Sequence, residues 1–210
     1  MEVGALAPYE QALITAGPLS LRTDDGRLIV LDLARWLGAV DRADETVLAR
    51  CRGPVLDVGC GPGRFVSSLN ARGIAALGVD IAETAVALTR GQGLPALLRS
   101  VFGDLPGEGR WPTVLLLDGN IGIGGDPLRL LSRIRLLLAA GGALIVETHP
   151  DHQADDLLEV RFSEHGAAVG PLFDWANVGR DPLLRYAGRA GYRVDELWSS
   201  DGRSFAALGR

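Results

Sequence analysis

Residues 55–65 read VLDVGCGPGRF, an apolar run that leads into a turn with three glycines. Val55, Leu56 and Val58 are typical of a strand buried inside a parallel sheet. The glycines allow backbone conformations and close approaches that a Cβ atom would block; they are Gly59, Gly61 and Gly63. A helix should begin near Arg64, where free backbone N–H groups suit a polar or anionic ligand group. The stretch therefore predicts a ligand cradle between a buried strand and a helix.

The spacing of these glycines separates the nucleotide-type ligands that such a turn can hold. A dinucleotide fingerprint places its third glycine three residues after the second, and Arg64 stands at that position. A P-loop needs a lysine before a serine or threonine, but all 21 residues counted as lysine or arginine are arginines. The turn thus disfavours NAD and excludes ATP binding by a P-loop.

Length and composition favour one domain over residues 1–210. The net charge is −5 and the arginines are scattered, so no basic patch is expected for a nucleic-acid backbone. The first residues do not resemble a signal peptide, and no stretch reaches the about 18 uninterrupted apolar residues of a membrane span. Cys51 and Cys60 fit neither a metal knuckle nor a disulfide framework. We expect a soluble cytoplasmic protein with reduced thiols, no metal site, and no nucleic-acid or membrane partner.

Apolar runs alternate with helical patterns from residue 50 onward, which is typical of an α/β fold. We predict a doubly wound, mostly parallel seven-stranded sheet with an antiparallel last strand and helices on both faces. The predicted strands are 55–58, 75–79, 96–100, 113–117 and 143–147, followed by 192–198 and 204–208 as an antiparallel pair.

Two helices carry clear start signals, because each begins with Asp-Pro. The first has Asp126 as its N-cap, places Leu130, Leu131, Ile134, Leu137 and Leu138 on one face, and is predicted to stop at Gly141. The second should run from about Asp181 to Gly191. A third helix is expected over residues 82–90.

Polar residues follow several of the predicted parallel strands. Ligands of such sheets bind outside the carboxyl ends of the strands, at the point where the strand order reverses. The first five strands would deliver there Asp57 with the glycine turn, Asp80, Val101 with Phe102, Asp118 with Asn120, and Thr148 with His149. We therefore predict the functional site at this edge.

Asp57, the three glycines and Asp80 resemble the motifs of class I S-adenosylmethionine-dependent methyltransferases. The resemblance covers about the middle half of the chain. It implies S-adenosyl-L-methionine as cofactor, S-adenosyl-L-homocysteine as product, and a carboxylate at Asp80 that accepts hydrogen bonds from the ribose hydroxyls, with Ile81 beside it. The alternative for Asp80 is a cap for the helix over 82–90.

The resemblance also assigns the methionine end of the cofactor. Asp57 would hold the cationic amino group, directly or through water, or would order the glycine turn by accepting backbone N–H bonds. Gly59, Cys60, Gly61 and Gly63 would present backbone to the methionine and ribose. Cys60 is interpreted as a small side chain tolerated in a crowded bend.

At the adenine end the sequence departs from the family pattern. The acidic residue that commonly meets the adenine amino group falls on Val101. A backbone contact from Phe102, with apolar packing by Val101 and Phe102, would replace it. Asp104 is the acidic alternative, unless it is only a turn residue ahead of Pro106.

The segment Leu115–Pro127 holds four glycines after a predicted strand. Asp118, Gly119 and Asn120 would lie beside the sulfonium, with Ile121 and Ile123 as an apolar wall. Alternatively, the later glycines form a flexible loop that reaches the cap at Asp126. The segment lacks the Asn-Pro-Pro-Tyr type of sequence found in amino-directed nucleic-acid methyltransferases, which argues against that substrate class.

The implied reaction is in-line displacement at the methyl carbon, and it needs a base only if the nucleophile arrives protonated. His149 is the leading candidate, because it follows a strand and imidazole titrates near neutral pH. His152, Asp118 and Glu147 come next. The alternative is that His149, like most single histidines in loops, is solvated or structural.

Substrate choice should reside outside the core, in residues 1–50 and 150–179. The first section, with a short helix near Tyr9, would form a lid. The second is predicted as a hairpin around 164–166 whose aromatic residues line an apolar pocket or belong to the core; they are Phe162, Phe173 and Trp175. Two small closing elements favour a small-molecule methyl acceptor. A protein substrate, a cofactor-binding protein without transfer activity, and a nicotinamide oxidoreductase are the alternatives.

Overall fold

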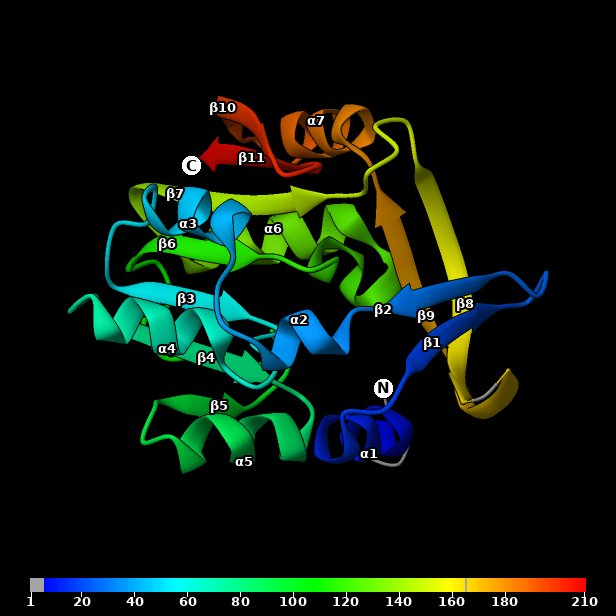
Figure 1. The fold of residues 1–210 in the computed structure, drawn as a ribbon. Coiled ribbons are helices and arrows are strands. Elements are labelled where there is room, and N and C mark those ends of the chain that lie inside the picture. The colour runs from blue at the N-terminus through cyan, green and yellow to red at the C-terminus, as the bar shows by residue number, and fades with distance from the viewer. Residues whose placement is uncertain (1–5, 165) are drawn as a thin grey trace.

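The computed structural model describes residues 6–164 and 166–210 and contains two sheets. The main sheet has seven strands in the order β10-β11-β7-β6-β3-β4-β5 (Figure 1). Neighbours among β5, β4, β3, β6 and β7 pair in parallel, whereas β11 and β10 are antiparallel. The strands are β3 (Val55–Val58), β4 (Ala76–Asp80), β5 (Ala96–Leu98), β6 (Trp111–Leu116), β7 (Leu138–Thr148), β10 (Arg193–Ser200) and β11 (Arg203–Gly209). The predicted fold class is confirmed.

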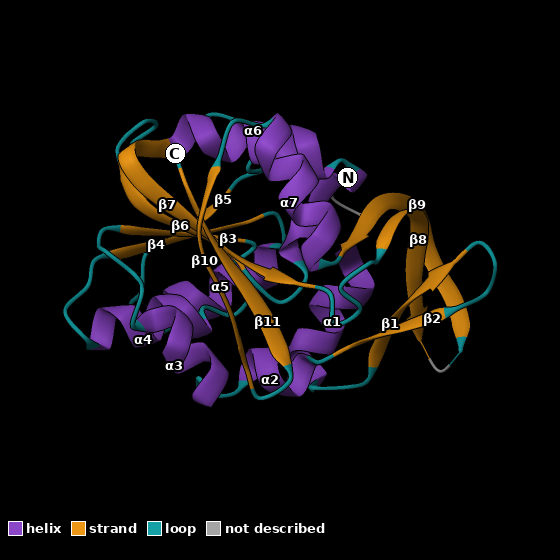
Figure 2. Cartoon of the chain, turned by 90° about the horizontal axis from the view of Figure 1, so that it is seen from above, coloured by secondary structure: helices purple, strands orange, loops and turns teal. Residues whose placement is uncertain are grey.

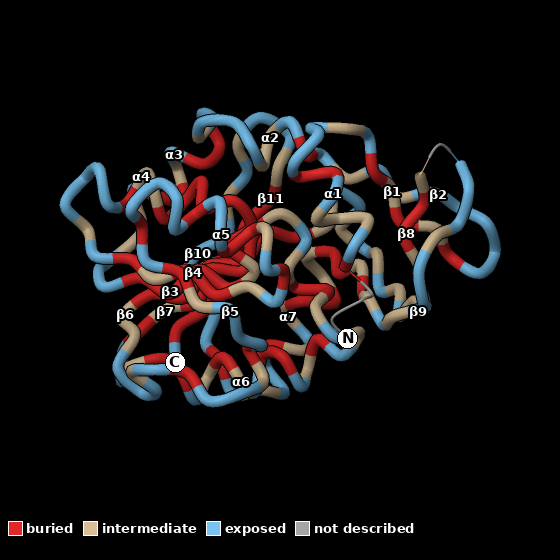
Figure 3. Tube along the Cα trace, turned by 90° about the horizontal axis from the view of Figure 1, so that it is seen from below, coloured by how far each residue is buried: buried red, intermediate tan, exposed pale blue. Residues whose placement is uncertain are grey.

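Helices cover both faces of the main sheet, as Figure 2 shows. One face packs against α6 (Pro127–Leu137) and α7 (Arg180–Arg189), and the other packs against α3 (Arg42–Leu48), α4 (Arg64–Ala71) and α5 (Glu83–Gly91). Figure 3 shows that buried residues concentrate along the strands between these helices. No helix of the described residues is long and apolar enough to span a membrane.

Helix α6 begins as predicted but ends earlier. The Asp126 carboxylate accepts a hydrogen bond from the Arg129 N–H at 2.9 Å, so this residue is the N-cap. The helix stops at Leu137 rather than at Gly141, because Leu138 is extended and pairs with Trp111 in the β6–β7 ladder. The prediction that Leu138 belongs to the helix is therefore wrong, although its side chain is still buried.

The second sheet, here called the cap sheet, has four antiparallel strands in the order β2-β1-β8-β9. Its strands are β1 (Leu19–Thr23), β2 (Leu28–Leu31), β8 (Asp155–Glu164) and β9 (Ala167–Val178). The two segments that the sequence treats as separate closing elements thus pair with each other, with Leu21 opposite Phe162. The predicted hairpin is formed by β8 and β9, and residue 165 in its turn lies outside the described residues.

The cap sheet stands beyond the carboxyl ends of β3, β4 and β6, whose arrowheads point toward it in Figure 1. Two short helices accompany it, α1 (Ala7–Thr15) and α2 (Leu33–Leu37). Helix α1 connects the cap to the core, because the Glu10 carboxylate accepts a hydrogen bond from the Thr84 N–H at the start of α5. Leu6 and Leu13 share an apolar cluster with Ala82 and Ala85.

Candidate active site

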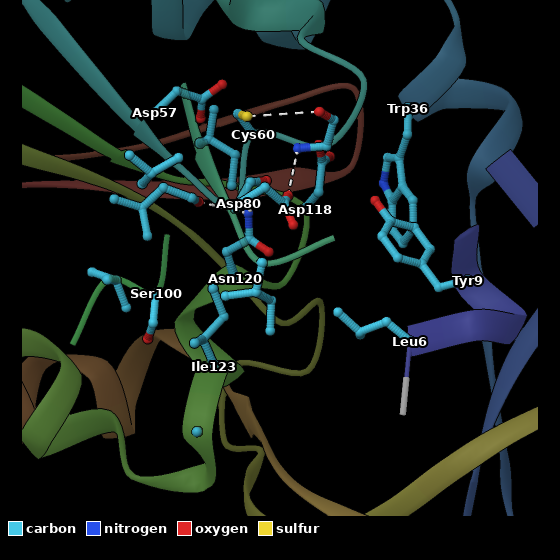
Figure 4. Close-up of a pocket in the computed structure, with 18 of the residues that line it drawn as sticks. Leu6, Tyr9, Trp36, Asp57, Cys60, Asp80, Ser100, Asp118, Asn120 and Ile123 are labelled. Atoms are coloured by element: carbon cyan, nitrogen blue, oxygen red, sulfur yellow. Dashed lines mark hydrogen bonds between the residues drawn. The ribbon is translucent and has the colours of Figure 1, made fainter. Parts of the chain in front are cut away.

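A cavity of about 300 Å³ lies between the carboxyl edge of the main sheet and the cap sheet (Figure 4). One wall comes from the loops that follow β3, β4, β5 and β6. The opposite wall comes from α1, α2 and the cap sheet. In Figure 4, Leu6, Tyr9 and Trp36 face Asp80, Asp118 and Asn120 across this space. The site therefore joins the edge predicted from the strands with both segments outside the core.

The glycine turn forms a bare backbone cradle at the end of β3. Gly59 and Gly61 have φ angles of +71° and +53°, which favour glycine. A Cβ atom on Gly59 would lie 2.6 Å from Asn120 Nδ2, which itself donates to the carbonyls of Val58 and Gly59 at 2.9 Å. Gly63 does not line the cavity. It precedes α4, and a Cβ atom there would lie 2.7 Å from the Thr89 side chain, so it permits helix packing.

Asp80 faces the cavity and holds the glycine turn. Its Oδ2 accepts a hydrogen bond from the Gly61 N–H at 2.9 Å, drawn in Figure 4, and its Oδ1 accepts one from the Ala82 N–H at 2.9 Å. Burial raises the pKa of Asp80, while these backbone hydrogen bonds act in the opposite direction. Ala82 is the N-cap residue of α5 and contributes no side-chain cap. Ile81 also lines the cavity.

Asp57 is 3% exposed, lines the cavity and accepts no hydrogen bond within the described part of the chain. The turn amides that could have satisfied it donate elsewhere: Gly59 and Cys60 to the Val79 carbonyl, and Gly61 to Asp80. Burial, together with the nearby Asp118 and Asp80 carboxylates, raises the pKa of Asp57 to about 8. A cationic group in the cavity would favour its ionised form.

Cys60 lines the cavity, and its side chain packs over Gly78, where a Cβ atom would lie 2.5 Å from Cys60 Sγ. Burial raises the pKa of its thiol. The Cys60 side chain therefore fills the small space beside Gly78.

The loop after β5 forms one end of the cavity. Val101 and Phe102 line it, together with Arg99 and Ser100. The Phe102 N–H donates to Ser100 Oγ at 3.2 Å. Asp104 is exposed and is not among the lining residues.

Asp118 lines the cavity and is surrounded by arginines. Its carboxylate contacts Arg64 Nη2 at 2.6 Å, Arg35 Nη2 at 2.9 Å and Arg203 Nη2 at 3.5 Å. Arg64 and Arg203 also pair with the fully buried Asp44. Asp118 has a positive φ of 55°, so this charge network holds an uncommon backbone conformation at the edge of the site.

The glycine-rich segment after Asp118 is a turn of 3-10 helix, η2 (Asn120–Gly125), that contacts the cap. Asn120, Ile123 and Gly124 line the cavity, whereas Ile121 is buried in the core and Gly119 is not among the lining residues. A Cβ atom on Gly122 would lie 2.2 Å from the Ala176 carbonyl of β9. The later glycines therefore allow η2 to approach the cap sheet closely.

The other candidate bases are not among the residues that line the cavity. His149 Nδ1 accepts a hydrogen bond from the Asp151 N–H at 3.1 Å, and His152 Nε2 lies 3.3 Å from Ser204 Oγ. Burial would raise the pKa of Glu147, but hydrogen bonds from Arg203 and the Asp118 N–H lower it below its usual value. A role for His149 as general base stays a prediction.

Phe162, Phe173 and Trp175 line the cavity and also belong to, or pack against, the apolar cluster of the cap. Sequence reasoning missed Trp36 as a lining residue and considered Arg64 only as the start of a helix and as the position that lacks a third glycine, because both side chains reach the site through tertiary packing. Tyr9 packs between Trp36 and Phe162, and burial raises the pKa of its hydroxyl well above the usual value. Trp36 Nε1 is buried and has no hydrogen-bond partner within the described residues.

The profile of the methyltransferase domain family matches residues 32–197. The chain belongs to this methyltransferase family. The resemblance to class I methyltransferases, inferred from Asp57, the glycine turn and Asp80, is thereby confirmed. A comparison with curated proteins found no match. Within residues 6–164 and 166–210, no group of three or more His, Cys, Asp or Glu side chains is arranged to hold a metal ion.

Solved methyltransferase structures share the fold. The S-adenosylmethionine-dependent methyltransferase from Bacteroides fragilis, in complex with S-adenosyl-L-homocysteine, aligns with a TM-score of 0.78 and 19% identity, over 98% of this chain and 94% of that one. The 1,6-didemethyltoxoflavin-N1-methyltransferase from Burkholderia thailandensis aligns with a TM-score of 0.57 and 18% identity, over 74% of this chain and 70% of that one. The sugar N-methyltransferase from a Streptoalloteichus species aligns with a TM-score of 0.59 and 18% identity, over 80% of this chain and 85% of that one.

Proposed function

We propose that this methyltransferase binds S-adenosyl-L-methionine in the cavity and transfers its methyl group to a small organic molecule by in-line displacement. The observation that carries the proposal is the cavity itself. Bare backbone at 59–61 and the carboxylates of Asp57 and Asp80 form one wall, and the apolar cap forms the other. The proposal treats residues 1–210 as one methyltransferase domain, with residues 1–50 and 150–179 supplying the acceptor side, and places it in the cytoplasm.

The residues present fit this cofactor. Asp57 is a buried carboxyl without a hydrogen-bond partner among the described residues, which suits the cationic amino group. The Asn120 side chain occupies the space that a Cβ atom on Gly59 would take. Gly59 and Gly61 both line the cavity, where a ligand would meet the main chain. Asp80 would accept hydrogen bonds from the ribose hydroxyls while its Gly61 contact keeps the turn in place. Val101 and Phe102 would pack on the adenine.

The chain's part in the reaction is alignment and exclusion of water. When bound, the cofactor supplies an activated methyl group on a sulfonium. The charge network around Asp118 fixes the loop that leads into η2 and keeps the Asp118 carboxylate paired. The apolar cap excludes water and limits the approach of the acceptor. Alignment of this kind contributes roughly 7 to 11 kcal/mol to lowering a reaction barrier.

The arrangement of the two cavity walls supports a small acceptor. Both walls of the cavity come from this chain, and the cap sheet covers the carboxyl edge where a large substrate would otherwise approach (Figure 1). Two of the similar structures are described as acting on a sugar or on 1,6-didemethyltoxoflavin.

Calorimetric titration with S-adenosyl-L-methionine, S-adenosyl-L-homocysteine and NAD tests cofactor choice. We expect saturable binding of the first two and none of NAD; the reverse pattern would overturn the proposal. Transfer of a labelled methyl group to a fractionated metabolite extract tests the reaction. Label in protein fractions only would indicate a protein substrate, and binding without any labelled product would indicate a cofactor-binding protein.

A further inference from the structure

The part of the cavity next to the cap sheet is apolar. We call it the acceptor chamber and define it by Leu6, Leu21, Leu31, Phe162, Phe173 and Trp175, which all line the cavity. The residues come from both segments outside the core and converge through the β1–β8 pairing. The rings of Phe162 and Phe173 lie 5.3 Å apart between centroids. Such walls favour flat apolar molecules, because aromatic rings gain from offset or tilted packing.

The titratable groups that line the cavity fall into a few classes: paired with opposite charges, assigned to the cofactor, held un-ionised by burial, positively charged, or exposed to solvent. Asp118 is paired with arginines, and Asp57 and Asp80 belong to the proposed cofactor wall. Burial keeps the pKa values of Tyr9 and Cys60 high, so neither ionises near neutral pH. Arg64 and Arg99 are positively charged side chains, and Asp174 lines the cavity but is exposed. His149 and His152 are not among the lining residues. Among the described residues, the chamber therefore offers no buried, unpaired base to an acceptor.

Building on the proposed function, we propose that the acceptor is a flat, mainly apolar aromatic molecule whose ring nitrogen or ring-bound sulfur supplies its own lone pair. An alcohol or a protonated amine would need a base, and no such base lines the chamber in the part of the chain that the structure describes. A polar sugar would lose its hydrogen bonds to water against the apolar walls. The proposed acceptor class thus follows both from the lack of a base among the described lining residues and from the apolar contacts that the cap offers.

The transfer balances without a proton on the protein. The acceptor lone pair forms the new bond to the methyl carbon, and the carbon–sulfur bond of the sulfonium breaks. Its electron pair stays on sulfur and yields the uncharged thioether of S-adenosyl-L-homocysteine. With a ring nitrogen, the positive charge moves to the methylated ring; with a thiolate, the two charges cancel. An apolar chamber favours the thiolate case, because two opposite charges are lost; in the ring-nitrogen case the total charge of the reacting pair is unchanged.

Four small molecules, offered as methyl acceptors with S-adenosyl-L-methionine as donor, test the proposal. Isoquinoline and 2-naphthalenethiol share a bicyclic size with 2-naphthol, a phenol that stays protonated near pH 7, and glucosamine represents a polar amine. We expect methylation of isoquinoline and 2-naphthalenethiol at rates at least about 10-fold above 2-naphthol, in line with the usual worth of a general base, and no methylation of glucosamine. Equal or faster methylation of glucosamine or 2-naphthol would overturn the proposal.

Cofactor titration separates this proposal from the proposed function. Binding of S-adenosyl-L-methionine without methylation of isoquinoline or 2-naphthalenethiol would overturn the acceptor class and leave the cofactor assignment standing. Absence of cofactor binding would overturn both.

Two variants on one strand locate the chamber. Phe173→Ala should raise KM for isoquinoline about 10-fold, and Phe173→Leu should bring KM most of the way back to that of the unsubstituted protein. The cofactor Kd should be unchanged in both variants. Leu172→Ala is the matched control, because Leu172 is the preceding residue of β9, is 39% exposed and does not line the cavity. An unchanged KM in Phe173→Ala, with the protein folded by circular dichroism, would contradict the assignment of the cap to the acceptor.

Discussion

The carboxyl edge of the main sheet and the cap sheet enclose the same cavity but are built in different ways. At the sheet edge, polar groups follow consecutive strands, and the backbone turn at 59–61 is fixed by hydrogen bonds to Val79 and Asp80. At the cap, apolar side chains come from two segments that pair across more than a hundred residues of sequence. On the proposed function, cofactor recognition is therefore encoded locally, whereas acceptor selection depends on long-range pairing.

Removal of the Asp80 carboxylate should have the largest effect on the sheet-edge side of this comparison. Asp80→Ala removes the partner of Gly61 and Ala82 as well as the proposed ribose contact, so S-adenosyl-L-methionine affinity should fall by at least about 100-fold. Titration calorimetry measures this, and retained acceptor-probe binding would show that the cap is intact. Unchanged cofactor affinity would disprove the ribose assignment.

A pair of glycine variants tests whether the cradle depends on the close contact between Gly59 and Asn120. Gly59→Ala should weaken cofactor binding by about 10-fold or more, because its Cβ would displace the Asn120 side chain. Gly73→Ala is the matched control: its φ is also +71°, but nothing lies within 4 Å of its Cβ. We expect Gly73→Ala to cost about 1 kcal/mol of stability with no change in affinity. Equal effects on affinity would attribute the loss to backbone strain instead.

The pH dependence of cofactor binding reports on Asp57. With its pKa raised to about 8, the free protein keeps this carboxyl protonated between pH 5.5 and 7.5, and binding of an ammonium group must release the proton. Affinity should therefore rise with pH in this window, approaching 10-fold per unit. Burial is the main cause of the raised pKa of Asp57, and the Asp118 and Asp80 carboxylates add to it. Titrations at four pH values would check the slope, and a flat profile would contradict the role of Asp57.

Asp57→Asn extends this test to stability. In the unfolded chain Asp57 ionises above its ordinary pKa of 3.8, whereas the folded chain holds the proton up to about pH 8. The free energy of unfolding therefore decreases as pH rises between these two values. The Asn variant should bind the cofactor more weakly and without pH dependence, but melt at a higher temperature at pH 7.5. A lower melting temperature would show that the carboxylate stabilises the fold.

The smallest effect is expected at His149. Since its side chain is not among the cavity-lining residues, His149→Ala should leave turnover within about twofold. His152→Ala serves as a second variant from the same loop. A loss of turnover of 100-fold or more, with an altered pH profile and unchanged cofactor affinity, would establish His149 as the general base.

The sheet-edge residues were predictable because strand alternation and turn chemistry are local. Asp57, Gly59, Asp80, Val101 and Asn120 all line the cavity where the strand order places them. The start of α6 was equally clear from Asp126 and the proline after it. Its end was not, because strand pairing with Trp111 competes with the helical pattern at Leu138.

The cap and the charge network could not be predicted because they depend on contacts between distant segments. The sequence suggested Phe162 and Phe173 as pocket residues but not the pairing of β8 with β1 that orients them. The sequence indicated Arg64 as the start of a helix and as the position that lacks a dinucleotide-type glycine, but it indicated no role for the Arg64 side chain. In the folded chain it is buried between Asp44 and Asp118, two carboxylates from distant elements.

A crystal structure with S-adenosyl-L-homocysteine tests the central claim most directly. The account predicts the ribose hydroxyls at Asp80, the amino group at Asp57 and the sulfur directed toward the chamber that Phe162 and Phe173 line. A ligand bound elsewhere, or an adenosyl group inserted against the cap sheet with Asp80 uncontacted, would contradict it.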